Sequence, residues 1–333
     1  MSSTTDRSTA ALLAACAAGA LWGTGALVVN LLIVRHGFTP ETISFWRFVV
    51  GSVVLLVVFG RPALWRAVRP RRPSKGRSRD GLTPAGGEAL RSDDSGGSPF
   101  WLVIASGACM SLYVLCWFLG IERIGASIPT LIALCLPPVL VTIVAVLRGQ
   151  ERVDLALLVV LAAALGGTAL IVARHGGSAG EVAGDVMLAG VGFSIASAVL
   201  YAGFTLVSGR LSQTLGAGPM TTCLTIVAAI TIGLSGLYRP IAWPAEVAPE
   251  AWLLYLGVVT AALALLAFSW GAARLTPTAL TVATLVEPLT AVALSALLLG
   301  EHLSGWQWLG GALLMGSIWG LSARASHPRR SRA

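Results

Sequence analysis

The chain has 333 residues, of which 56% are hydrophobic and only 11% are charged. A soluble globular domain carries about 25% charged residues, so this composition excludes a water-exposed surface over most of the chain and indicates a membrane protein. The net charge of +8 does not indicate a nucleic-acid partner. The basic residues stand between apolar runs, where they orient a chain in the lipid bilayer.

Ten apolar runs are each long enough for a spanning helix, which needs about 20 residues to cross a hydrocarbon core of about 30 Å. The alternating pattern of membrane β-strands is absent from these runs, so an all-α polytopic membrane protein is predicted. In chain order, we place the ten transmembrane helices at residues 10–34, 41–60, 99–120, 126–147, 154–173, 186–208, 217–238, 250–270, 277–300 and 305–323.

The polar segments between these runs predict the orientation of the chain in the cell membrane. Eighteen basic residues fall on the side that holds both termini, and four fall on the other side. Because cytoplasmic segments carry an excess of Lys and Arg, both termini are expected in the cytoplasm. Residues 61–98 lie on the same side and are too polar to bury a core, which predicts a disordered cytoplasmic loop. A lipid-headgroup or partner site in this loop stays open, and residues 324–333 form a basic tail.

The second half of the chain repeats the first. A shift of 151 residues aligns three pairs of residues: Gly120 with Gly271, Arg123 with Arg274 and Pro137 with Pro288. We therefore expect two five-helix repeats, at residues 10–173 and 186–323. Since five is odd, the second repeat enters the membrane upside down, which is the inverted repeat of many secondary transporters.

Several segments carry a resemblance to a known family. They are Ala20-Leu21-Trp22-Gly23-Thr24, Trp46-Arg47-Phe48, and the second-half run from Ala279 through Glu287-Pro288 to Leu298-Leu299-Gly300-Glu301. In this order, the chain resembles the EamA-type transporters of the drug/metabolite transporter superfamily. The resemblance implies two EamA domains and the export or exchange of metabolites or drugs, without naming a substrate. Leu136 stands where the second half has Glu287, so the two halves are not chemically equivalent.

Glu287 is the strongest candidate for a coupling or substrate site. An ionised group near the bilayer centre costs several kcal/mol, so Glu287 is expected to face protein or a water-filled cavity, where it would suit a proton carrier. Pro288 has no amide hydrogen and leaves the carbonyl of Thr284 without its helical donor, and this carbonyl could bind a cation or a substrate amine. The alternative is a protonated Glu287 that only bonds a neighbouring helix.

Arg47 lies about 9 Å inside its helix by helical rise. It could pair with a substrate carboxylate or with Glu287, or it could extend to the outer headgroups. Polar and aromatic residues also share helix faces, with Tyr113 and Trp117 on one helix and Ser197 and Tyr201 on another. Such faces suit an aromatic cavity for amphipathic or cationic substrates, and the alternative is packing between helices.

Trp22, within the first segment of the resemblance, is a further candidate for the substrate site. Pro137, Pro138 and Pro288 lie in mid-helix and predict kinks or hinges near the midplane. Two GxxxG spacings suit close contact between helices and leave a homodimer open; they are Gly19 with Gly23 and Gly316 with Gly320.

The function favoured by these patterns is a secondary transporter, most simply an exporter of small metabolites or drugs by alternating access, with proton coupling as an option. A membrane-embedded enzyme is the less favoured alternative, because neither HExxH nor paired aspartates occur in the apolar runs. A channel is also less favoured, because channels use rings of repeated filter residues and the two halves of this chain are unequal. The five cysteines lack metal spacing, so neither a metal nor a cofactor nor a catalytic residue is expected. The substrate, the direction of transport and the coupling ion are not readable from the sequence.

Overall fold

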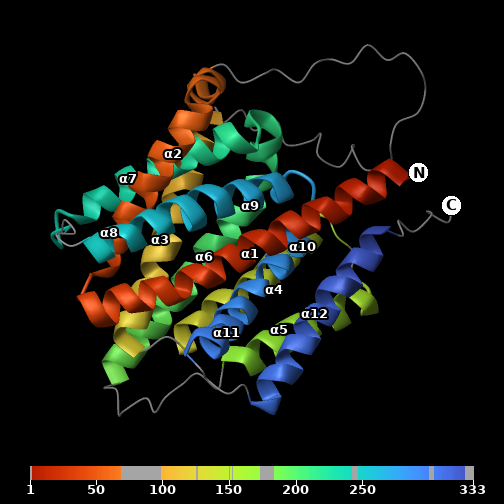
Figure 1. The fold of residues 1–333 in the computed structure, drawn as a ribbon. Coiled ribbons are helices and arrows are strands. Elements are labelled where there is room, and N and C mark those ends of the chain that lie inside the picture. Colours follow the sequence, from red (N-terminus) through yellow and green to blue (C-terminus); the bar gives the residue numbers. More distant parts are fainter. Residues whose placement is uncertain are drawn as a thin grey trace.

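The structure of the protein is a computed structural model. It describes residues 2–68, 99–124, 127–149, 151, 153–172, 184–241, 247–299 and 304–326. Within these residues every regular element is a helix, as the composition predicts, and the chain is an all-α polytopic membrane protein. Helix α1 begins and α12 ends at the same end of the bundle, on the right-hand side of Figure 1.

The described residues of the first half form five helices. They are α1 (Ser2–His36), α2 (Pro40–Val68), α3 (Pro99–Ile124), α4 (Ser127–Leu147) and α5 (Leu155–Val172). The prediction that residues 61–98 form a loop is wrong for its first eight residues, because α2 continues to Val68. This stretch contains Ala, Leu and Arg, which are strong helix formers. Residues 69–98 of the predicted loop and the tail from residue 327 lie outside the described residues.

The second half contains the other five predicted spans, and two of these are not single continuous α-helices. The helices are α6 (Gly184–Leu215), α7 (Ala217–Ser235), α8 (Val247–Tyr255), α9 (Ala264–Ala272), α10 (Pro277–Thr284), α11 (Val286–Leu299) and α12 (Gly305–Ser326). A π-helical segment, η2 (Leu256–Leu263), joins α8 to α9 into one span. The span expected at residues 277–300 is divided at Leu285 into α10 and α11.

Nine spans in the described residues are long and apolar enough to cross a membrane. The tenth predicted span corresponds to α12, whose 22 residues are also long enough. Its first turn contains Trp306, Gln307 and Trp308, which lower its mean hydropathy. Large apolar side chains such as Val57 and Leu147 are about four-fifths exposed on the protein alone, as expected of residues that face lipid.

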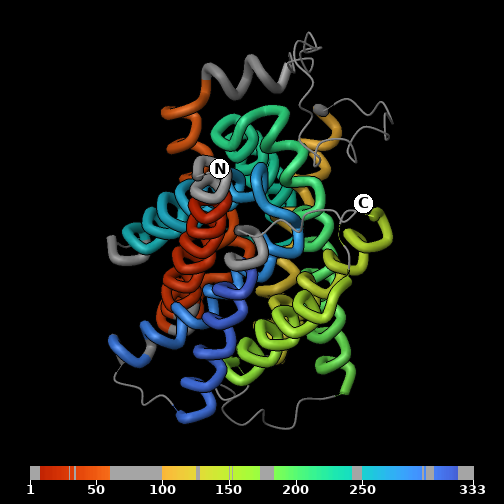
Figure 2. Tube along the Cα trace, turned by 90° about the vertical axis from the view of Figure 1, so that its right-hand side faces the viewer, coloured from red at the N-terminus to blue at the C-terminus, as the bar shows by residue number. Residues whose placement is uncertain are grey.

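Close helix contacts hold the bundle together. Figures 1 and 2 show α5 and α12 side by side at one edge, where Gly167 and Gly310 meet: a side-chain carbon added to either glycine would lie 2.6 Å from the other's carbonyl oxygen. In α1, Gly19 and Gly23 pack against the backbones of α10 and α11, so this GxxxG spacing serves contact within the chain. Gly316 faces open space and makes no such contact.

Candidate functional site

A cavity lies between the two halves of the bundle. The space between its lining residues, open solvent at the mouth included, is about 710 Å³. All eight residues predicted for a substrate or coupling-ion site line it. They come from six helices: Trp22 (α1), Arg47 (α2), Tyr113 and Trp117 (α3), Ser197 and Tyr201 (α6), Thr284 (α10) and Glu287 (α11). Residues up to 265 positions apart, Trp22 and Glu287, thus meet around one space, although their roles there stay predictions.

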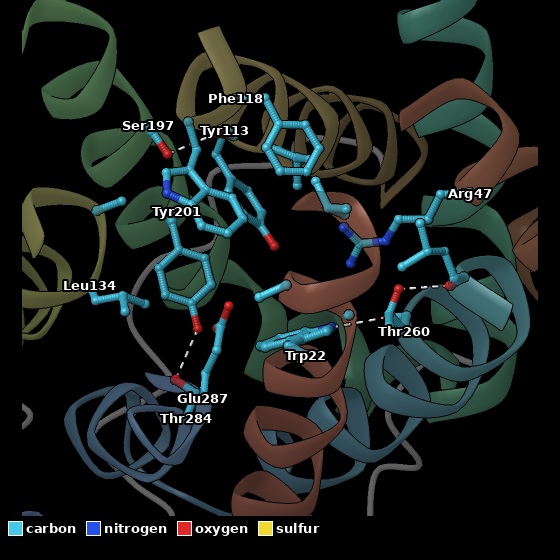
Figure 3. Close-up of a pocket in the computed structure, with 17 residues that line it drawn as sticks. Trp22, Arg47, Tyr113, Phe118, Leu134, Ser197, Tyr201, Thr260, Thr284 and Glu287 are labelled. Atoms are coloured by element: carbon cyan, nitrogen blue, oxygen red, sulfur yellow. Dashed lines mark hydrogen bonds between the residues drawn. The ribbon is translucent and has the colours of Figure 1, made fainter. Parts of the chain in front are cut away.

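Among the described residues that line the cavity, one side chain is cationic and one is anionic. Figure 3 shows Arg47 and Glu287 reaching the same space from different helices. Only 8% of Arg47 is exposed, so it does not extend to the headgroups as one alternative suggested. Its Nε has no hydrogen-bond partner, and its guanidinium lies 5.6 Å from the ring centre of Phe48. The charges of Arg47 and Glu287 act on each other across the cavity.

Aromatic rings form much of the wall. The rings of Tyr113 and Tyr201 lie 5.0 Å apart, and Trp22 lies 5.6 Å from Phe268. Trp117 also lines the cavity and donates from Nε1 to the hydroxyl of Thr130 at 3.2 Å. These separations fall in the range of favourable aromatic pairs, so the wall is a packed surface that offers ring faces to a ligand.

The polar residues of α6 divide into two groups. Ser197 donates to the carbonyl of Tyr113 at 2.8 Å, and the hydroxyls of Tyr201 and Thr284 lie 3.1 Å apart. These contacts join α6 to α3 and α10. Three other hydroxyl side chains of α6 donate to carbonyls of their own helix, four residues back; they are Ser194, Thr205 and Ser208. Only the first group therefore belongs to the cavity.

The break between α10 and α11 lies beside Glu287. The amide of Leu285 donates to the carbonyl of Val282, three residues back, so the chain makes a tight turn there. The carbonyl of Thr284, which Pro288 leaves without a helical donor, lies against α1: a side-chain carbon added at Gly19 would be 2.6 Å from its oxygen. A ligand role for this carbonyl therefore stays a prediction, while the Thr284 hydroxyl lies beside that of Tyr201 at the cavity.

Pro137 and Pro138 lie inside α4, which continues through both. Ala133 and Leu134, four residues earlier, line the cavity. The two prolines thus mark the part of α4 that borders the site, as Pro288 does for α10 and α11, while α4 itself is not divided.

Sequence reasoning missed the contribution of η2. Leu256 and Thr260 of this π-helical segment line the cavity, and Trp22 donates from Nε1 to the carbonyl of Thr260 at 3.0 Å. π-Helical turns occur often at functional sites. The segment Leu-Gly-Val-Val-Thr-Ala-Ala-Leu has no polar face, so its sequence carries no signal that could have pointed to this position.

Comparisons with known proteins found a family, a relative and a similar fold. The model of the EamA-like transporter family matches residues 9–173 and 188–323. The protein named "Uncharacterized transporter YwfM" from Bacillus subtilis (strain 168) is 28% identical over 242 residues, which cover 69% of this chain and 75% of that protein. A crystal structure with 21% sequence identity is similar over 95% of this chain and 98% of its own, with a TM-score of 0.69. At that identity, the likeness concerns the fold.

Proposed function

Because the chain belongs to the EamA-like transporter family, we propose that it is a secondary transporter that exports small metabolites or drugs across the cell membrane by alternating access. The observation that carries this proposal is the cavity, in which eight polar, charged and aromatic residues from both halves of the chain meet. A site between two repeats is the arrangement that lets each half expose it in turn.

The lining of the cavity favours a small amphipathic substrate. Ring faces of Trp22, Tyr113 and Tyr201 suit an apolar or aromatic body, and Arg47 and Glu287 suit polar or charged groups on it. In this proposal, Glu287 binds the coupling proton. An ionised carboxylate enclosed by protein is costly unless it is paired with a cation, so Glu287 is protonated when no substrate or cation neutralises it.

The cavity lies nearer to one end of the helices than to the other. Its residues lie in the later part of α1 and α3 and in the early part of α2, away from the end where α1 begins. If the basic side of the chain is cytoplasmic, this half of the bundle is the outer half. On the cytoplasmic side of the cavity, the hydroxyls of Thr142 and Thr278 lie 3.1 Å apart and join α4 to α10.

The test compares cells that express the wild type, Glu287→Gln or Glu250→Gln at equal membrane abundance. Glu250 lies in the first turn of α8, away from the cavity lining, and controls for the loss of one carboxylate. We expect the wild type and Glu250→Gln to enrich at least one compound in the medium, and Glu287→Gln to lose pH-driven export.

Equal export by Glu287→Gln would remove the proton role of Glu287 and leave the transporter assignment in place. Medium identical to that of empty cells over a broad panel of metabolites and toxic compounds would contradict export.

A further inference from the structure

The pattern of backbone hydrogen bonds changes within the span formed by α8, η2 and α9. In an α-helix, the carbonyl of Thr260 would accept a hydrogen bond from the amide of Ala264, four residues later. Here that amide donates to the carbonyl of Val259, five residues back. The carbonyl of Thr260 therefore loses its α-helical donor at the point where the chain returns to the α-helix α9. A backbone carbonyl inside a membrane span needs a partner from within the protein.

Trp22 supplies this partner from the other half of the chain. Its Nε1 donates to the Thr260 carbonyl at 3.0 Å, across 238 positions of sequence. Both residues are buried, since Trp22 is 8% exposed and Thr260 is 1% exposed. An indole has a single N–H donor, so this bond fixes which edge of the ring points to η2. The bond also fixes how the rest of the ring lies in the cavity wall (Figure 3).

Further contacts pack η2 against the neighbouring helices. Tyr255, directly before η2, donates its hydroxyl to that of Thr24 in α1 at 2.6 Å. A side-chain carbon added at Gly25 of α1 would lie 2.7 Å from Cγ2 of Thr260. A carbon added at Gly257 would overlap a side chain of α2. Because no room for an extra carbon remains on either helix, η2 cannot move without repacking α1 or α2.

We propose that Thr260 is a positioning residue for the cavity: the π-helical pattern of η2 frees its carbonyl, and this carbonyl fixes the orientation of the Trp22 indole. A segment of the second half thereby sets the ring surface that the first half presents to a ligand. The ring of Phe268, which follows η2 in α9, lies 5.6 Å from that of Trp22 and adds a second contact from the same span. The use of this orientation in substrate binding rests on the proposed function, whereas the orientation itself does not.

Nuclear magnetic resonance of the indole groups tests this role of Thr260 without a substrate. In protein labelled with ¹⁵N at the indole nitrogens of its 11 tryptophans, the signal of Trp22 is assigned by its loss in Trp22→Phe. Deletion of Val258 removes one residue from η2, so that the segment can pair as an α-helix and the amide of Ala264 can bond the Thr260 carbonyl. We expect the Trp22 indole hydrogen to exchange with solvent about fivefold faster in this variant, the factor for one lost hydrogen bond.

Two controls separate this effect from a general loosening of the bundle. Val258→Ala keeps the length of η2 and should leave the exchange at Trp22 unchanged. Trp117 is the internal control in every spectrum, because it also lines the cavity but its Nε1 donates to Thr130 of α4. A faster exchange at Trp22 with an unchanged signal of Trp117 supports the proposal.

A second variant of full length guards against a deletion that prevents folding, which size-exclusion chromatography detects. In Gly25→Ala, the added carbon displaces the Thr260 side chain, so the Trp22 indole hydrogen should again exchange faster, and this variant decides if the deletion variant does not fold. Unchanged exchange at Trp22 in the deciding variant, or an equal increase at Trp22 and Trp117, overturns the proposal. No arm measures transport, so failure here is distinct from failure of the proposed function.

Discussion

Helix α4 and the α10–α11 pair are aligned by the 151-residue repeat, and both border the cavity, yet one is continuous and the other is divided. Proline interrupts helices, yet the helix with more interior prolines is the continuous one. Two adjacent prolines, Pro137 and Pro138, lie inside continuous α4. The divided pair has Pro277 at the start of α10, and its one interior proline is Pro288, three residues after the break at Leu285.

What differs is the neighbour that each helix meets. The Thr284 carbonyl lies against the backbone of α1 at Gly19, where the missing side chain allows the approach. In α4, the carbonyls that Pro137 and Pro138 leave without helical donors are those of Ala133 and Leu134, and both residues line the cavity. Membrane helices tolerate proline wherever neighbours or side chains satisfy the freed backbone groups. The comparison therefore indicates that packing against α1, together with proline, decides where the helix is divided.

Gly19→Ala should have the largest effect on this comparison. The added carbon would lie 2.6 Å from the Thr284 carbonyl oxygen, a backbone atom that cannot rotate away. We expect a loss of about 1–3 kcal/mol in the free energy of unfolding, as for other overpacked sites. Gly316→Ala is the control, because nothing lies within 4 Å of the added carbon, and it should gain about 0.5 kcal/mol from helix propensity. Unfolding in detergent measures both, and equal shifts would contradict the role of Gly19.

Pro288→Ala should reduce the difference between the divided pair and continuous α4. Alanine supplies an amide hydrogen that can bond the Thr284 carbonyl, so the helix can close across Leu285. We expect amide exchange around residues 284–288 to slow about tenfold, or about 1.4 kcal/mol. Pro137→Ala should change exchange in α4 less, because that helix is already continuous. A larger change in α4 than at Leu285 would show that proline position alone sets the break.

Thr142→Val tests the link between the two compared helices and should have the smallest effect. The Thr142 hydroxyl lies 3.1 Å from that of Thr278, which joins α4 to α10. Its loss should cost about 0.5–1.5 kcal/mol, the net value of one hydrogen bond. Thr168→Val is the matched control, since Thr168 is also buried but bonds only the carbonyl of Ala164 in its own helix. Equal unfolding free energies for the two variants would show that the link between α4 and α10 adds nothing.

The sequence predicted which residues form the candidate site better than it predicted how those residues are arranged. Arg47 and Glu287 stand out in any apolar run, because charge in a membrane is costly and must face protein or water. The aromatic and hydroxyl residues on the cavity-facing sides of α3 and α6 follow from helical periodicity. The same periodicity could not separate Ser197, which bonds across to α3, from Ser194, which bonds its own helix. That choice depends on the partner a hydroxyl meets in space.

The amino-acid sequence by itself determined that the chain is an all-α membrane protein, where most of its spans lie and which family it belongs to, because the length and apolarity of each span are local properties. Only the tertiary structure decided the division at Leu285, the π-helical segment η2 and the contact of Trp22 with Thr260. These features depend on close approaches between segments far apart in the chain, such as Gly19 against Thr284, and no local pattern of residues encodes such a distance.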